Sequence, residues 1–387
     1  MVITPADNLM RSKLLAREIP GLQVCSIAGA IAPTVTVRKG AMVKKWAAIG
    51  GGCLLLLVAA VGAVYFHIQE FARTPSGAAG EEQSFTVETG QPVSVVAESL
   101  ERRGLISSAI KFRLFARLQD YDRRLKAGEY GLKASMTPLD ILALMEKGLV
   151  RLHRLTVPEG LTIPQIAAVV EKTGLARAAD IIARATDPAY VRLQGVPAGT
   201  LEGYLFPETY LFPKTVTADG IIGAMLQRFR STFSPDWERR AMEIGLTPHE
   251  VVTLASIVEK ETGDPSERPL IASVFHNRLK LGMRLETDPA VIYGIKNFDG
   301  NLTRKHLETP SPYNTYLLKG LPPGPIASPG KKAIEAALFP AQTDYLFFVS
   351  KNNGSHQFSN NLPDHNRAVQ YYQLGPGRSP HPPRRSQ

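Results

Sequence analysis

The chain has 387 residues, of which 44% are hydrophobic and 21% charged, a composition typical of a folded protein large enough for two modest domains. The formal net charge is +10, but residues 1–45 hold seven Lys and Arg against two acids, and the tail from Pro376 adds three Arg and no acid. Because the folded body is nearly neutral, this distribution argues against a nucleic-acid-binding protein, whose basic residues would lie on the body.

An apolar run without a charged residue, WAAIGGGCLLLLVAAVGAVYF, covers residues 46–66. Its length predicts a helix that spans a bilayer, and the Lys and Arg before it predict a cytoplasmic segment, residues 1–45. The alternatives are a buried core helix, which the missing polar face disfavours, and a cleaved signal peptide, for which the run is long. Met42, which is followed by Val and two Lys, is a hypothetical translation start.

The two cysteines, Cys25 and Cys53, lie before or inside the apolar run. The rest of the chain therefore has no thiol for a disulfide framework or a cysteine-based metal site. No metal and no cofactor is expected. The histidines His276, His306 and His356 stand apart without ligand spacing, as does His365, and all four are expected to be surface or structural groups.

Residues 67–83 are predicted to be a linker, and residues 84–150 a small domain with the order strand, helix, helix, strand. A further helix follows, with Thr137 as its N-cap and Gly148 as its stop. Helical periodicity places Val95, Val96, Leu100 and Leu105 on one face of the first helix. The apolar residues of the second helix are Phe112, Phe115, Ala116 and Leu118.

Residues 151–373 are predicted to be a larger domain, and residues 374–387 a disordered tail. The larger domain has a strand near residue 152, several amphipathic helices, and a hairpin whose strands flank an Asn-Asn-Gly turn. The expected fold class is therefore α+β, with one N-terminal transmembrane helix, a small βααβ domain and a larger α+β domain.

The string TPHEVVTLASIVEKETG, residues 247–263, predicts a well-bounded helix. Thr247 and Glu250 have the spacing of a capping box, Pro248 occupies the first helical position, and Gly263 ends the helix. An apolar stripe at helical spacing follows. It consists of Val251, Leu254, Ala255 and Val258.

Glu261 falls at the edge of this stripe, in line with Leu254 and Val258. A carboxylate against an apolar surface has its charged form disfavoured, so its pKa rises toward the range of a general acid. Glu261 is therefore the candidate acid and base. Glu259 lies on the opposite flank and is expected to be exposed at the surface.

Three strings downstream are rich in polar residues, Pro and Gly: residues 283–294, 311–330 and 360–368. Their Tyr, Asn and Thr residues offer rings for stacking on sugars and amides for binding N-acetyl groups. Strings of this length with interleaved aromatic residues favour a binding surface over simple connections.

The strings VPEG, LEGYLFPETY, ASIVEKET, RPLIASVFHNRLKLGMRLETDPAVIYG, YNTYLLKGLPPGPIASPG and HNRAVQ together resemble the membrane-anchored endolytic murein transglycosylases, the MltG/YceG-like family. The resemblance implies a LysM-like domain at residues 84–150, a catalytic domain at 151–373 and Glu261 as the catalytic residue. It further implies substrate binding by cleft residues, which are Thr287, Asp288, Tyr313, Asn314, Thr315 and Tyr316.

The same resemblance implies a single-pass protein of the inner membrane with a periplasmic catalytic domain. Its substrate is then the peptidoglycan glycan strand, and its partners are glycan polymerases such as penicillin-binding proteins. Cleavage of nascent strands would end their elongation, with roles in cell shape and septation.

A lytic transglycosylase needs one carboxyl group, since the sugar's own C6 hydroxyl attacks C1 and no water is consumed. One rival is a hydrolytic muramidase, in which Asp288 or Glu286 is the second carboxylate. The other rival is a non-catalytic scaffold that binds peptidoglycan. The sequence has neither the HExxH nor the GxSxG motif, which argues against a metalloprotease or a serine hydrolase.

Overall fold

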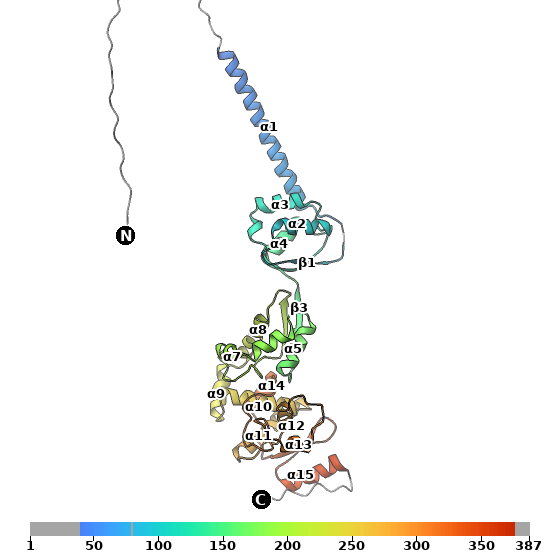
Figure 1. The fold of residues 1–387 in the computed structure, drawn as a ribbon, viewed down its shortest axis with the longest axis vertical. Helices are drawn as coiled ribbons and strands as arrows, with labels where there is room; N and C mark the ends of the chain where they lie inside the picture. Colours follow the sequence, from blue (N-terminus) through green and yellow to red (C-terminus); the bar gives the residue numbers. More distant parts are fainter. Residues whose placement is uncertain (1–38, 79, 376–387) are drawn as a thin grey trace, which may run out of the picture. The chain divides into compact units, whose positions relative to one another are not determined.

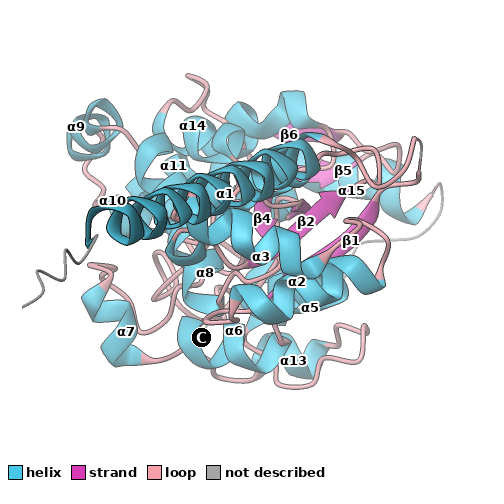
Figure 2. Cartoon of the chain, turned by 90° about the horizontal axis from the view of Figure 1, so that it is seen from above, coloured by secondary structure: helices cyan, strands magenta, loops and turns pink. Residues whose placement is uncertain are grey.

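The computed structural model describes residues 39–78 and 80–375, with side chains from Ile49 onward. Residues 1–38 of the predicted cytoplasmic segment and 376–387 of the predicted disordered tail lie outside the described residues. The segment's residues 39–45 are helical, and Leu374, the first residue of the predicted tail, ends a helical turn. Helices predominate in the described part, with short pairs of strands between them (Figure 1, Figure 2). The expected mixed fold with one N-terminal apolar helix is confirmed.

The first helix, α1 (Lys39–Arg73), contains the predicted membrane span. Its stretch from Ile49 to Arg73 has the length and the mean hydropathy, 2.2, of a helix that can cross a membrane. All side chains from Ile49 to His67 are exposed, which disfavours the alternative of a buried core helix. The helix is therefore a candidate membrane anchor.

The predicted linker, residues 67–83, is wrong in its first part. The helix α1 continues to Arg73, and Ile68, Phe71 and Ala72 are buried in a hydrophobic cluster with residues of the following domain. These three positions have helical spacing. The helix that contains the apolar run therefore continues without a break into a turn that packs against the small domain.

The small domain has the predicted order β1 (Gln83–Val87), α2 (Val93–Arg102), α3 (Ala109–Leu118), β2 (Gly128–Leu132). β1 and β2 are antiparallel, with Phe85 opposite Tyr130, and α4 (Pro138–Lys147) follows with the predicted Thr137 cap. One position of the predicted helical face is wrong: Val95 is 40% exposed and lies beside the buried face of α2, which Val96 and Leu100 form. In α3, Phe112 and Phe115 are buried, whereas Leu118 is 50% exposed.

The larger region packs around a second hydrophobic cluster. β3 (Leu152–Thr156) pairs antiparallel with β4 (Thr209–Pro213), and β5 (Phe347–Ser350) with β6 (His356–Ser359), which confirms the predicted hairpin. The domain boundary at residue 150 stays a prediction. The other elements are η1 (Tyr121–Arg123), α5 (Ile163–Lys172), α6 (Ala178–Ala185), α7 (Pro188–Leu193), α8 (Ala218–Thr232), α9 (Pro235–Glu243), α10 (Pro248–Glu261), η2 (Pro265–Glu267), α11 (Arg268–Lys280), α12 (Asp288–Tyr293), α13 (Arg304–Glu308), α14 (Lys331–Leu338), α15 (Leu362–Val369) and the π-helical turn η3 (Gln370–Leu374).

The helix α10 lies at the centre of this cluster, with α11, α12 and α14 against it (Figure 1). Its capping box is confirmed, since Thr247 Oγ1 accepts from Glu250 N and the Glu250 carboxylate accepts from Thr247 N. A cap of this kind is worth about 1 kcal/mol. The predicted apolar stripe is too narrow, because every residue from Val251 to Val258 is buried. Over these residues the helix is enclosed on all sides, and its last two residues, Lys260 and Glu261, lie beyond the enclosed stretch.

The expectation that Glu259 is exposed is wrong. Its side chain is 7% exposed and forms an ion pair with Arg268 at 2.9 Å. The segment of residues 326–330 covers this side of α10: Gly330 N donates to Glu259 Oε2, and Ile326 N donates to Ser256 Oγ. The end of the string 311–330 is therefore packed protein interior, not a sugar-binding loop.

Candidate active site

Glu261, the last residue of α10, lines a pocket of about 250 Å³. The pocket combines acidic, basic and aromatic side chains from α11, from the segment 285–288 and from the C-terminal hairpin and helix. The other lining residues are Phe275, Arg278, Leu285, Glu286, Asp288, Tyr316, Phe348 and His365.

The carboxyl group of Glu261 is held by Thr287, whose Oγ1 donates to Glu261 Oε1 at 2.6 Å. Thr287 is itself fixed by Thr315, because Thr315 Oγ1 accepts from Thr287 N at 3.0 Å and donates to Thr287 O at 3.2 Å. Thr287 and Thr315 are both buried. The structure thus brings three of the predicted site residues into one hydrogen-bonded chain that ends at the carboxyl group.

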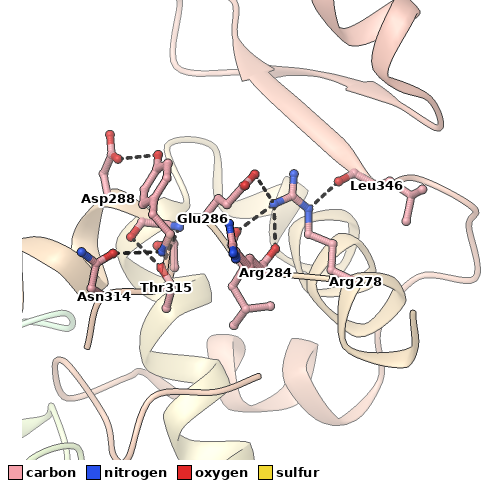
Figure 3. A network of polar contacts seen from close by, with 10 residues as sticks. Arg278, Arg284, Glu286, Asp288, Asn314, Thr315 and Leu346 are labelled. Carbon is pink, nitrogen blue, oxygen red and sulfur yellow. Dashed lines mark hydrogen bonds and ion pairs between the residues drawn. The ribbon is translucent and has the colours of Figure 1, made fainter. Parts of the chain in front are cut away.

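Tyr316 and Asp288 form the second polar pair of the pocket. Tyr316 Oη donates to Asp288 Oδ1 at 2.8 Å (Figure 3). Burial, followed by this hydrogen bond, raises the pKa of Tyr316, so the phenol stays a neutral donor. Both residues line the pocket, as the sequence predicts for substrate-binding residues.

Asn314 and Tyr313 do not line this pocket. Asn314 is fully buried, and its Nδ2 donates to the carbonyl oxygens of residues 306, 307 and 309 while its Oδ1 accepts from Tyr316 N. Tyr313 packs edge-on against Tyr293, with ring centroids 4.8 Å apart. Asn314 therefore fixes the loop that carries Tyr316. The contacts of both residues therefore favour a structural role over the predicted binding of substrate.

Arg278 is a pocket residue that the sequence analysis missed. Its side chain is 9% exposed, and Nε donates to Leu346 O at 2.7 Å while Nη1 donates to Arg284 O at 3.1 Å and Leu285 O at 3.0 Å (Figure 3). Nη1 also pairs with Glu286 Oε2 at 3.3 Å. One guanidinium group therefore ties Leu346, which directly precedes β5, to the segment that carries Thr287. Helical periodicity alone gives no signal for such contacts.

His365 also lines the pocket, a position that the sequence analysis did not predict for it. Its ring stacks on Phe347, with centroids 5.1 Å apart, and its Nδ1 is buried without a hydrogen-bond partner among the described residues. Burial and the nearby Arg278 lower its pKa, so the imidazole is neutral. The signal that points to it is the polar string 360–368, in which it lies.

Burial raises the pKa of Glu261 to about 7. The hydrogen bond from Thr287 lowers this pKa and the charge of Asp288 raises it, with smaller lowering effects from His356 and Arg278. Glu261 forms no ion pair with any described residue. A carboxyl group with this pKa can donate a proton near neutral pH and take one back, which is the requirement for a combined acid and base.

The YceG-like family model matches residues 85–371. The chain belongs to the YceG-like family.

Relatives within this family include the protein named endolytic murein transglycosylase of Bacillus subtilis (strain 168), which is 34% identical over 75% of this chain and 84% of its own length. The Streptococcus pneumoniae D39 protein of the same name is also 34% identical, over 72% of this chain and 56% of its own length. A crystal structure of a YceG-like protein from Listeria monocytogenes aligns with a TM-score of 0.52 and 34% identity, covering 74% of this chain and 99% of that one.

Proposed function

We propose that this YceG-like chain is a peptidoglycan lytic transglycosylase that cleaves the β-1,4 bond between N-acetylmuramic acid and N-acetylglucosamine within glycan strands. The observation that carries this proposal is the carboxyl group of Glu261, which lines a pocket and has a pKa of about 7. The names of the relatives from Bacillus subtilis and Streptococcus pneumoniae support the same reaction and substrate.

In the proposed reaction Glu261 first acts as an acid. The protonated carboxyl group donates to the glycosidic oxygen, and the bond from that oxygen to C1 of N-acetylmuramic acid breaks. The C6 hydroxyl oxygen of the same sugar then attacks C1, and the Glu261 carboxylate takes the hydroxyl proton. The product carries a 1,6-anhydro end, and Glu261 is protonated again. Thr287 holds the carboxyl group in position for both steps.

The contacts of the other two pocket carboxylates favour this reaction over hydrolysis. Asp288 accepts from the Tyr316 phenol, and Glu286 pairs with Arg278. A hydrolase would need one of them to activate a water molecule or to attack C1. Both are already engaged in fixing the pocket wall, so we assign them to positioning and Glu261 to the chemistry.

The reaction is tested by mass spectrometry of products from uncrosslinked glycan strands, with the full chain in detergent and with Glu261→Gln. Products with anhydro ends, one water lighter than hydrolysed ends and absent with the variant, are the expected result. Reducing ends would establish a muramidase instead. Glycan binding without any product would establish a scaffold.

The pH dependence of kcat/KM gives a second prediction. Because protonated Glu261 is the acid, the rate should fall about tenfold per pH unit above its pKa of about 7. Thr287→Val removes a hydrogen bond that lowers this pKa and should move the alkaline limb to higher pH. Asp288→Asn removes a charge that raises it and should move the limb to lower pH. Shifts in the same direction for both variants would contradict the assignment of the limb to Glu261.

The remaining features of the proposal concern topology and partners. The candidate span in α1 supports an anchor in the inner membrane, and the Lys and Arg before it support a cytoplasmic N-terminus and a periplasmic catalytic domain. The order β1, α2, α3, β2 is consistent with a LysM-like small domain. An anchored enzyme of this kind would meet nascent strands where glycan polymerases extend them, and its cleavage would end their elongation.

A further inference from the structure

The helix α3 of the small domain has an apolar stripe on its outer face as well as on its inner one. The inner side chains, among them Phe112 and Phe115, are buried. On the outer face Ile110 is 75%, Leu114 41% and Leu118 50% exposed. Residues four apart share one side of a helix, so the three form a single stripe. Exposed apolar side chains gathered in this way mark an interaction surface.

Basic side chains flank this stripe. Arg113 and Arg117 are exposed on α3, and neither guanidinium group forms a hydrogen bond or an ion pair with any described residue. Both line a groove of about 550 Å³ that runs between the start of α2 and α3 and has Asp122 as its acidic residue. Two arginines against one acid make this face complementary to anionic groups.

The same helix contacts the end of α1. Lys111 Nζ lies 2.8 Å from His67 Nε2 and 5.8 Å from the centroid of the Phe71 ring. His67 directly follows the apolar run that ends at Phe66. The Lys111 side chain of α3 therefore lies beside the residue that directly follows the apolar run.

We propose that the outer face of α3 (Ile110, Arg113, Leu114, Arg117 and Leu118) lies on the surface of the membrane that α1 crosses. The apolar side chains enter the boundary between headgroups and acyl chains, and the arginines bind anionic phospholipid headgroups. Interfacial helices have this combination of an apolar stripe and basic flanks. The contact would restrain the small domain at the membrane. The proposal rests on the membrane anchor of the proposed function.

The test uses the full chain, with Cys25→Ser and Cys53→Ala, in proteoliposomes of phosphatidylglycerol and phosphatidylcholine. An environment-sensitive fluorophore is attached at Leu114→Cys and, as a matched control, at Leu139→Cys, an exposed apolar position on α4 outside the groove. Lipids that carry a nitroxide on the acyl chain serve as quenchers. We expect severalfold stronger quenching at residue 114 than at 139, and a loss of this difference with Arg113→Glu/Arg117→Glu or in phosphatidylcholine alone.

Equal or absent quenching at the two positions would overturn the proposal. Quenching at residue 114 that changes with the ratio of protein to lipid would also overturn it, because a second copy of the chain would then cover the stripe. A change in the fluorescence at residue 114 that appears only when glycan strands are added would overturn it as well. Flotation of the chain with the liposomes tests the anchor separately, and anhydro products from the same liposomes test the reaction. A chain that fails to float refutes both the anchor and this surface. The arginine variant should keep its thermal melting temperature and its activity on soluble strands, because neither arginine touches the catalytic pocket.

Discussion

Glu261→Gln is expected to abolish the formation of anhydro products while leaving a protein that is more stable than the wild type. General acid and base catalysis by one side chain contributes about 10²–10⁴ in rate, and here one residue serves as both acid and base. Gln keeps the size of the side chain and an oxygen that accepts from Thr287. The variant should therefore fold and bind glycan without turnover, which mass spectrometry of the products measures.

The stability gain follows from the pKa of Glu261. Burial raises it from 4.5 to about 7 in the folded protein, so the folded state holds a proton that the unfolded state releases between these pH values. The free energy of unfolding of the wild type therefore falls as pH rises from about 4.5 to about 7, by about 3 kcal/mol from this group. Gln does not titrate. The variant should gain stability over this window and keep a constant lead above it, which denaturant unfolding at several pH values measures.

Glu202→Gln is the matched control. Burial also raises the pKa of Glu202 to about 7, but Glu202 accepts from Ile163 N and from Tyr293 Oη and does not line the pocket. The Glu202→Gln variant should therefore gain stability over the same pH window as Glu261→Gln, and it should retain the wild-type activity. Residual turnover in Glu261→Gln above about one hundredth of the wild-type rate would reject Glu261 as the acid. Loss of activity in Glu202→Gln would show that stability and catalysis are coupled.

The sequence predicted the helix that carries Glu261 well, because the signals for it are local. The capping box of Thr247 and Glu250, the proline and the apolar spacing all lie within one helix, and they place Glu261 against the core without reference to any other segment. The same local argument failed for Glu259. A helical wheel gives the directions of side chains, but the ion pair with Arg268 and the contact with Gly330 come from segments remote in the chain.

The pocket as a whole could not be predicted from local patterns. Thr287 and Asp288 came from the resemblance to a family, and the structure shows what they contact. Arg278 has no signal in the sequence, because its partners are backbone carbonyl groups just before β5 and in the segment after α11. The strand β4 lies in a Pro- and aromatic-rich stretch without clean alternation, and only its pairing with β3 reveals it.

Arg278→Met is expected to have the second largest effect, on both stability and rate. Met fills most of the buried volume but leaves the carbonyl groups of Leu346, Arg284 and Leu285 without their donor. Leaving buried carbonyl groups without a donor costs about 1–3 kcal/mol for each group, which thermal or denaturant unfolding measures. Because the lost contacts hold the segment that carries Thr287, kcat should fall as well.

A readout from the pH profile separates positioning from a general loss of folding. The charge of Arg278 lowers the pKa of Glu261, so its removal should move the alkaline limb of kcat/KM to higher pH in the fraction that is folded. Arg278→Lys keeps the charge but not the forked donors, and should lose stability without moving the limb. Arg304→Met breaks an exposed pair with Glu308 and should change neither quantity. If Arg278→Met keeps the stability of the wild type and the alkaline limb of its kcat/KM profile does not move, the prediction is wrong. Contacts other than those of Arg278 then hold the segment of Thr287 against Glu261.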